Sequence, residues 1–423
     1  MGTLLHLFVA LTVVLLAAAA GRRLAQAVGQ PAVVGEIAVG MLLAPAVIAV
    51  AGRDTYAAVL PDGVHEGLRL FGQAGLILFL VGVGHELRHW PAGRRGPELG
   101  WFVAGAFLLP LSLGLLFGAW VVTAAPPEVR GAAPAPGLVL LMAVAFAVTA
   151  VPVLARILLE RRLTTTPVGR LAMTGATIID VAAWLMLVLA ITLASRGGPS
   201  AVLRAGAVLA AGLALAVLAR RALSTAVVRR GCATAPRLAA IVIGGTGLLA
   251  ATLSEHGGMT AIFGALLVGL AIPDDAGAAR WSAVVGWVSR VGLALVPAFF
   301  VVAGAALLAG PVTGVPWLLT AVVVAIGCVG KLVGSYVGAR LGGHPPSVGA
   351  RLAVLMNTRG LTEIVVLQAG YQAGILTRDL LLALLAMALI TTAMTGPLLS
   401  LLDRRAARRA PAPEPTPVAE PVG

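Results

Sequence analysis

Thirteen long apolar runs, separated by short polar connections, constrain this chain more than any other feature of its sequence. A run of roughly 20 apolar residues can cross a bilayer as a helix. Of the 423 residues, 59% are hydrophobic and 11% are charged, whereas about 25% of a soluble chain is charged. The sequence therefore predicts an all-α polytopic membrane protein with about thirteen transmembrane helices. The runs cover residues 4–20, 32–51, 68–84, 100–123, 137–159, 170–194, 201–219, 237–253, 259–272, 282–309, 315–338, 349–370 and 379–402.

The connections between these runs carry most of the arginines, and the arginines alternate strongly between the two sides. The odd-to-even connections and the C-terminal end contain Arg22, Arg23, Arg88, Arg94, Arg95, Arg161, Arg162, Arg220, Arg221, Arg229, Arg230, Arg280, Arg340, Arg404, Arg405, Arg408 and Arg409. The other side has only Arg53, Arg69, Arg130, Arg196, Arg204 and Arg378. Since cytoplasmic loops are enriched in Lys and Arg, we expect the N-terminus outside and the C-terminus in the cytoplasm. The net charge of +13 is thus explained by topology and does not point to nucleic acid.

Two ionisable residues lie inside apolar runs and need an explanation. Asp180 is in the middle of the sixth run, and Lys331, the only lysine of the chain, lies in the eleventh. A charge at the bilayer centre costs at least ~2.5–3.5 kcal/mol, so it needs a partner, a water-filled cavity or a proton. A buried acid and a buried lysine can neutralise each other, and we expect function at this pair. The alternative is a purely structural pair.

Two of the runs contain residues that interrupt a helix. The fifth run contains Thr149 and Pro152, and the twelfth contains Thr358, Arg359 and Glu363 in a polar cluster. Proline breaks the hydrogen-bond ladder of a helix, and polar residues at membrane depth line cavities. Interrupted helices at corresponding places in two halves of a chain indicate a transporter site between inverted repeats. Arg359 and Glu363 are also four residues apart, so they either neutralise each other structurally or lie along the permeation path.

Several stretches, in this order, resemble the monovalent cation:proton antiporters, in particular the branch with Kef-type and bacterial Na⁺/H⁺ exchanger proteins. The likeness extends over about residues 20 to 400. It rests on Gln30-Pro-Ala-Val-Val-Gly35-Glu36, Gly75 to Leu87, Thr149-Ala-Val-Pro152 to Arg156, Asp180-Val-Ala-Ala-Trp184, Gly264 to Gly269, Pro297 to Gly304, Lys331 to Arg340 and Met356 to Glu363.

This resemblance implies a core of six helices that carries two crossed, partly unwound helices and moves against a dimerisation scaffold. We expect the core at about residues 100–194 and 315–402 and the scaffold in the remainder of residues 1–402. Residues 403–423, rich in Pro, Ala and Glu, predict a disordered cytoplasmic tail with no room for the nucleotide-binding domain that many relatives append.

One position departs from the pattern of the family. Members usually have Asp, Asn or Gln immediately before the residue equivalent to Asp180, and this chain has Ile179. Lys331, by contrast, resembles the lysine of electrogenic members. The two features disagree, so the coupling ratio stays open.

The sequence as a whole predicts a secondary antiporter, without enzymatic activity or a cofactor, in the cell membrane. In this hypothesis Asp180 binds a proton and a monovalent cation, Na⁺ or K⁺, in turn, and the protein is a homodimer. Backbone carbonyls near Pro152 and Gly360, with the Thr149 and Thr358 hydroxyls, would supply further oxygen ligands. The alternatives are a Kef-like K⁺ efflux system with channel-like gating and a non-transporting membrane sensor with the same fold.

Overall fold

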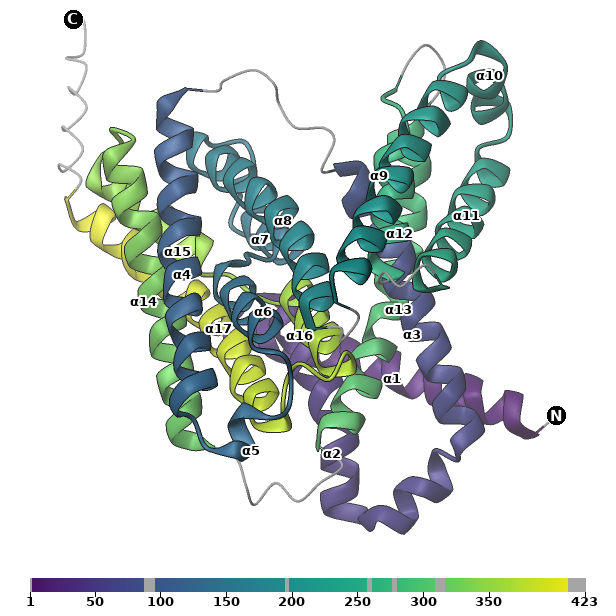
Figure 1. Cartoon of the computed structure of the whole chain (residues 1–423), viewed down its shortest axis with the longest axis horizontal. Coiled ribbons are helices and arrows are strands. Elements are labelled where there is room, and N and C mark those ends of the chain that lie inside the picture. The colour runs from purple at the N-terminus through teal and green to yellow at the C-terminus, as the bar shows by residue number, and fades with distance from the viewer. Residues whose placement is uncertain are drawn as a thin grey trace, which may run out of the picture.

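The computed structural model of the chain is built from α-helices that lie mostly side by side (Figure 1). It describes residues 2–86, 96–194, 198–256, 261–275, 280–308 and 316–409. The arginines at 88, 94, 95 and 196 lie outside these residues. The helices are α1 (Gly2–Ala27), α2 (Ala32–Val59), α3 (Asp62–Glu86), α4 (Pro97–Ala124), α5 (Pro127–Arg130), α6 (Ala135–Ala147), α7 (Val151–Glu160), α8 (Pro167–Ala194), α9 (Gly198–Leu223), α10 (Ala226–Thr234), α11 (Pro236–His256), α12 (Ala261–Ala271), α13 (Trp281–Leu308), α14 (Trp317–Leu341), α15 (Pro346–Met356), α16 (Leu361–Gln372) and α17 (Arg378–Arg409).

The predicted membrane-spanning segments are confirmed as helices. Ten helices within the described residues are long and apolar enough to cross a membrane. The shorter α12 covers the ninth predicted segment, and the pairs α6–α7 and α15–α16 cover the fifth and the twelfth. Helices suit a bilayer because they satisfy their backbone hydrogen bonds internally. Prolines begin several of them, at positions where the missing N–H has no helical partner.

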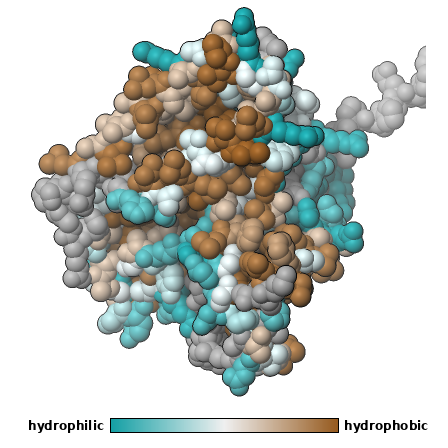
Figure 2. All heavy atoms as spheres, turned by 90° about the vertical axis from the view of Figure 1, so that its right-hand side faces the viewer, coloured by the Kyte–Doolittle hydropathy of each residue, from teal (hydrophilic) through white to brown (hydrophobic). Residues whose placement is uncertain are grey.

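The outer surface fits contact with lipid. Figure 2 shows hydrophobic side chains gathered over the face that lies on the right of Figure 1. The exposed large hydrophobic side chains of α9 and α11 include Leu213, Leu215, Leu218, Leu238, Ile241 and Leu249. Large contiguous apolar patches are rare on soluble monomers. The chain is therefore a multi-pass membrane protein.

The helices form two groups, which are visible on the left and right of Figure 1. The first group, which we call the broken-helix group, comprises α4, α6, α7, α8, α14, α15, α16 and α17; the second, the outer group, comprises α1, α2, α3, α9, α11, α12 and α13. Glycines bring the backbones of neighbouring helices together within each group. A Cβ atom on Gly105 of α4 would lie 2.6 Å from the Cα atom of Gly338 in α14, and one on Gly292 of α13 would lie 2.4 Å from the amide nitrogen of Phe79 in α3. Such close approach of small residues is how helices associate in membranes, where the hydrophobic effect supplies little force between them.

Both predicted interruptions are present, and they meet. The helical path stops at Ala147 and resumes at Val151, and it stops again at Met356 and resumes at Leu361. The amide of Ala150 donates a hydrogen bond to the carbonyl of Thr358 at 3.2 Å. The two non-helical segments, 148–150 and 357–360, are thus joined directly where the broken helices cross.

The C-terminal end differs from the expected disordered tail. Residues 403–409 continue α17, and residues 410–423 lie outside the described part of the chain. Ala and Arg favour helices, and arginines in a last turn interact well with the negative end of the helix. Asp403 also forms an ion pair with Arg351 at 2.7 Å, which ties this last part of α17 to α15.

Candidate functional site

The crossing of the two broken helices brings four helix ends together inside the broken-helix group. The last residues of α6 and α15 present carbonyl groups, and the first residues of α7 and α16 present amide groups. Helix ends leave such groups without partners inside the helix, with partial negative charge at the carbonyl end and partial positive charge at the amide end. The crossing can therefore hold ions of both signs.

Lys331 projects from α14 onto the carbonyl end of α6 and has no solvent exposure. Its ammonium donates hydrogen bonds to the carbonyl of Ala147, to the hydroxyl of Thr149 at 2.7 Å and to the carbonyl of Ala106 at 3.2 Å. An ammonium has three protons to donate, so all of them are used. Lys331 thus acts as a cationic cap on α6.

Arg359 binds the same helix end from the second break. Its guanidinium donates to the carbonyls of Ala145 and Phe146, the latter at 2.8 Å, and to Glu363 Oε1 at 3.0 Å. Arg359 and Glu363 are both fully buried and form an ion pair, which is one of the two roles that the sequence left open for them. Two cationic side chains, one from α14 and one from the second break, therefore compensate the partial negative charge of the carbonyl groups in the last turn of α6.

Asp180 differs from both cations, because its carboxylate is left without a partner. It lies in α8 with no exposure, and neither oxygen accepts a hydrogen bond from any described residue. Lys331 interacts with it through its charge, and the amide of Val151, the first residue of α7, faces it without reaching the geometry of a full hydrogen bond. The expected direct pairing of Asp180 and Lys331 is therefore wrong for this conformation. The lysine protons go instead to the carbonyls of Ala106 and Ala147 and to the hydroxyl of Thr149, and these pairings depend on how α4, α6 and α14 pack.

The two predicted threonines lie at the crossing, where they bind helix ends. The Thr149 hydroxyl accepts from Lys331 and donates to the carbonyl of Met356 at 3.4 Å. The Thr358 hydroxyl donates to the carbonyl of Leu355 at 2.8 Å, so it closes the end of its own helix. Pro152 is the second residue of α7, where a proline needs no hydrogen bond, and the break lies just before it.

Three further polar residues lie at the site: Asn357, which the sequence indicated only as part of the polar cluster of the twelfth run, and Thr391 and Thr392, which were not singled out. Asn357 donates to the carbonyl of Thr391 at 3.3 Å, and the Thr392 hydroxyl accepts from the amide of Arg359 at 2.8 Å. All three are buried. A signal was available, because Thr391 and Thr392 are polar residues in the middle of the last apolar run, and such residues mark functional sites in membranes.

The chemistry of this arrangement follows from the unpartnered carboxylate. A buried ionised carboxylate without hydrogen bonds is costly, so it gains by binding a proton or a cation. Carboxylate and backbone carbonyl oxygens are hard ligands that suit alkali cations and protons. The side-chain donors of Lys331 and Arg359 are already bound by carbonyls, which leaves Asp180 as the acid that can exchange its partner.

Comparison with known proteins agrees with this geometry. The family model described as "Sodium/hydrogen exchanger, transmembrane" matches residues 11–402. Cation/H(+) antiporter 20 of Arabidopsis thaliana is 32% identical over 87% of this chain and 45% of its own length, and Na(+)/H(+) antiporter NhaS4 of Synechocystis sp. is 29% identical over 87% and 90%. The chain spans about half the length of the Arabidopsis relatives that it matches. The structure of the sodium proton antiporter MjNhaP1 from Methanocaldococcus jannaschii superposes with a TM-score of 0.61 at 15% identity, over 93% of this chain and 99% of that one, so the two share a fold.

Proposed function

Because the chain belongs to the sodium/hydrogen exchanger transmembrane family, we propose that it exchanges protons for a monovalent cation, Na⁺ or K⁺, by alternating access. The observation that carries this proposal is the carboxylate of Asp180, which is fully buried and has no hydrogen-bond donor among the described residues. The names of the relatives support antiport, since they are described as cation/H⁺, Na⁺/H⁺ and K⁺/H⁺ antiporters.

Coupling arises because one carboxylate serves both substrates. Protonated Asp180 is neutral, and so is Asp180 with a bound Na⁺ or K⁺, whereas the empty anion is costly in this buried position. The protein therefore crosses between its two orientations with a proton or with a cation on Asp180. Lys331 lies near enough to favour the empty anion electrostatically during the exchange of one for the other.

The moving part in this proposal is the broken-helix group, residues 97–194 and 317–409, and the outer group is the scaffold. The site lies entirely inside the moving group, so it travels as a unit. The arginine distribution supports a cytoplasmic C-terminus in the cell membrane. A homodimer formed through the outer group is part of the same proposal and rests on the resemblance to the antiporters.

The proposal is tested by proton flux in proteoliposomes that contain a trapped pH dye. We expect addition of Na⁺ or K⁺ to change the internal pH with the wild type, and the effective cation identifies the substrate. Asp180→Asn removes the exchangeable charge and should abolish the response. Asp54→Asn makes the same change at an exposed residue at the end of α2, and it should transport like the wild type.

Two outcomes would refute antiport at Asp180. One is a folded wild type that responds to neither cation from mildly acidic to alkaline pH. The other is an Asp180→Asn variant with the activity of the wild type.

A further inference from the structure

Trp184 ends the stretch Asp180-Val-Ala-Ala-Trp184 of α8, and the proposed function gives it no role. Its side chain is only 6% exposed, and its indole nitrogen, Nε1, donates a hydrogen bond to no described residue. The N–H group of a buried tryptophan usually has a hydrogen-bond partner. Because a buried donor without an acceptor is costly, the missing partner of this N–H group needs an explanation.

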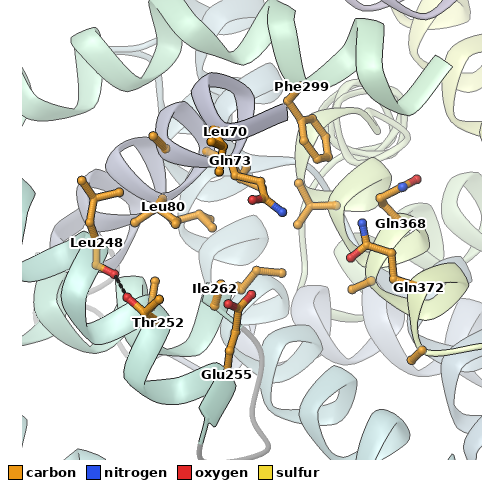
Figure 3. A pocket seen from close by; sticks show the side chains of 18 of the residues that line it. Leu70, Gln73, Leu80, Leu248, Thr252, Glu255, Ile262, Phe299, Gln368 and Gln372 are labelled. Atoms are coloured by element: carbon orange, nitrogen blue, oxygen red, sulfur yellow. Dashed lines mark hydrogen bonds between the residues drawn. The ribbon is translucent and has the colours of Figure 1, made fainter. Parts of the chain in front are cut away.

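Water in the cavity between the two helix groups does not supply this partner. The cavity has a volume of about 640 Å³, and its walls come from α3, α11, α12 and α13 of the outer group and from α16 and the end of α8 of the broken-helix group (Figure 3). Ile191 is the residue of α8 that lines it. Trp184 precedes Ile191 by seven positions, which places the two about 10 Å apart along the helix. The indole N–H group is therefore enclosed by protein.

An acceptor without a donor lies one turn away on the same helix. Both carboxylate oxygens of Asp180 are buried and accept no hydrogen bond from a described residue. Residues four positions apart are neighbours on the surface of a helix, with Cβ atoms about 5–6 Å apart. Since Cα–Cβ bonds tilt toward the N-terminus of a helix, the side chain of Trp184 starts out toward the turn that carries Asp180. An unused donor and an unused acceptor are thus neighbours in the interior of the protein.

The other groups around Asp180 do not meet its need for a donor. The ammonium of Lys331 donates to two carbonyls and a hydroxyl. The amide of Val151 faces the carboxylate without reaching the geometry of a full hydrogen bond. The indole N–H of Trp184 is bound to nothing in the described part of the chain, so it is available to Asp180.

We propose that Trp184 is a positioning residue of the exchange site, and that its indole N–H binds the Asp180 carboxylate while this carboxylate holds a cation. This inference rests on the proposed antiport. A carboxylate has about four lone-pair positions, so it can bind a cation and still accept the indole N–H. A hydrogen bond to a charged group is roughly twice as strong as one between neutral groups, so this bond favours the cation-bound carboxylate over the protonated, neutral one. Because both residues belong to α8, the pair stays together when the broken-helix group moves.

Trp281 supplies a matched control for the loss of a buried indole N–H. It lies at the start of α13, is 2% exposed, and its Nε1 also has no partner among the described residues. Initial rates of exchange in proteoliposomes, measured at alkaline pH where protons compete least, give the KM for the effective cation. We expect Trp184→Phe to raise this KM about tenfold, which corresponds to about 1.4 kcal/mol, with kcat nearly unchanged. Trp281→Phe should leave the KM unchanged.

A second substitution separates the N–H group from the size of the ring. Benzothienylalanine, in which a sulfur atom replaces the indole N–H, keeps the bicyclic ring and removes the donor. In place of Trp184 it should raise the KM as much as Trp184→Phe does, while the melting temperature of the purified protein stays that of the wild type. If Trp184 only fills space, the benzothienylalanine variant keeps the KM of the wild type.

Tryptophan emission reports the same hydrogen bond by a separate route. We expect Na⁺ or K⁺ to change the emission of the purified wild type, because the indole gains a partner when the cation reaches Asp180. Trp184→Phe and Asp180→Asn should both lose this change, whereas Trp281→Phe should keep it. In a wild type that is active in exchange, an emission that does not respond, or a response that Trp184→Phe retains, would contradict the pairing.

The outcomes separate this inference from the proposed function. If the wild type does not exchange protons for cations, the proposed function fails. If the wild type is active and the benzothienylalanine variant keeps its KM, the role of Trp184 is refuted and antiport at Asp180 stands.

Discussion

At the scale of single residues, the site separates two buried charges that the sequence suggested as a pair. Lys331 is bound by two carbonyls and a hydroxyl, while the carboxylate of Asp180 has no protein donor among the described residues. A closed ion pair would need to break before either partner could bind anything else, at a cost of several kcal/mol in a low-dielectric interior. Keeping the lysine on α6 leaves the carboxylate free for the proposed exchange of a proton for a cation.

This arrangement predicts how the affinity for the cation depends on pH. If one carboxylate serves both substrates, protons compete with the cation, so the apparent KM for Na⁺ or K⁺ rises as the pH falls. The limit is about tenfold per pH unit for one proton at one site. Initial rates of dye-monitored exchange, measured over a range of cation concentrations at several pH values, give this slope. A KM that stays constant while kcat alone changes with pH would contradict competition at Asp180.

Lys331 itself is predicted to matter for stability as well as transport. Lys331→Met keeps much of the side-chain volume but leaves three buried oxygen acceptors without their donor, which we expect to cost roughly 3 kcal/mol or more. The melting temperature of the purified protein in detergent measures this loss. Arg340→Met is the matched control, since Arg340 is an exposed residue at the end of the same helix and donates to the carbonyl of His344. Equal melting temperatures for the two variants would show that the cap on α6 is dispensable.

The sequence was sufficient to find the ionisable residues of the site but not their partners. Asp180 and Lys331 stand out because charges are rare in apolar runs. The spacing of four residues suggested the pairing of Arg359 with Glu363, although Arg359 lies in the break and not on the helix. The acceptors at the end of α6 are backbone carbonyls of Ala145, Phe146 and Ala147, which are ordinary apolar residues in the sequence. Their role comes from where the helix stops, and this is a property of the fold.

At the scale of elements, the two broken helices depend on backbone conformations that only certain residues allow. Gly360, the N-cap residue directly before α16, has a φ angle of 153°, and a Cβ atom there would lie 2.6 Å from Val153 Cγ2 in α7. The break in the other helix falls at residues 148–150, before Pro152, because a proline fits the first turn of a helix. The sequence located both interruptions to within a few residues, whereas the hydrogen bonds that join them depend on the crossing and could not be derived from it.

Gly360→Ala is predicted to damage this crossing. The substitution adds backbone strain of about 1–3 kcal/mol and a steric contact with α7. We expect a lower melting temperature and a large loss of exchange activity. Gly245→Ala is the control, since Gly245 is an exposed glycine of α11 with no atom within 4 Å of an added Cβ, and alanine there should be neutral or slightly stabilising. If the two variants behave alike, the conformation of Gly360 is not important.

At the scale of the whole molecule, the two helix groups touch at one end and are separated by the cavity at the other. The amide of Ala32, at the start of α2, donates to Glu160 Oε1 at the end of α7 at 3.4 Å. A Cβ atom on Gly396 of α17 would lie 3.5 Å from the Cδ atom of Pro31. At the other end the cavity of about 640 Å³ separates the groups, and the broken-helix group contributes residues of α16 and the end of α8 to its wall. The proposed alternating access requires such an asymmetry, with one state open toward the side of the cavity and closed at the start of α2.

Alternating access predicts that linking the groups at their closed end stops transport. In a background without Cys232 and Cys328, the pair Pro31→Cys and Gly396→Cys should be joined by a short bifunctional thiol reagent, because the two positions are in contact. We expect exchange to fall to background when the groups are joined and to be unaffected by a monofunctional reagent.

The control joins two helices of the same group, through Ala339→Cys in α14 and Gly349→Cys in α15. A Cβ atom on Gly349 would lie 3.7 Å from that of Ala339, which suits a disulfide. This bond should leave transport intact, because both helices move together. Full activity with the first pair joined would mean that the groups do not separate at this end, and the exchange at Asp180 would then need a motion confined to the broken-helix group.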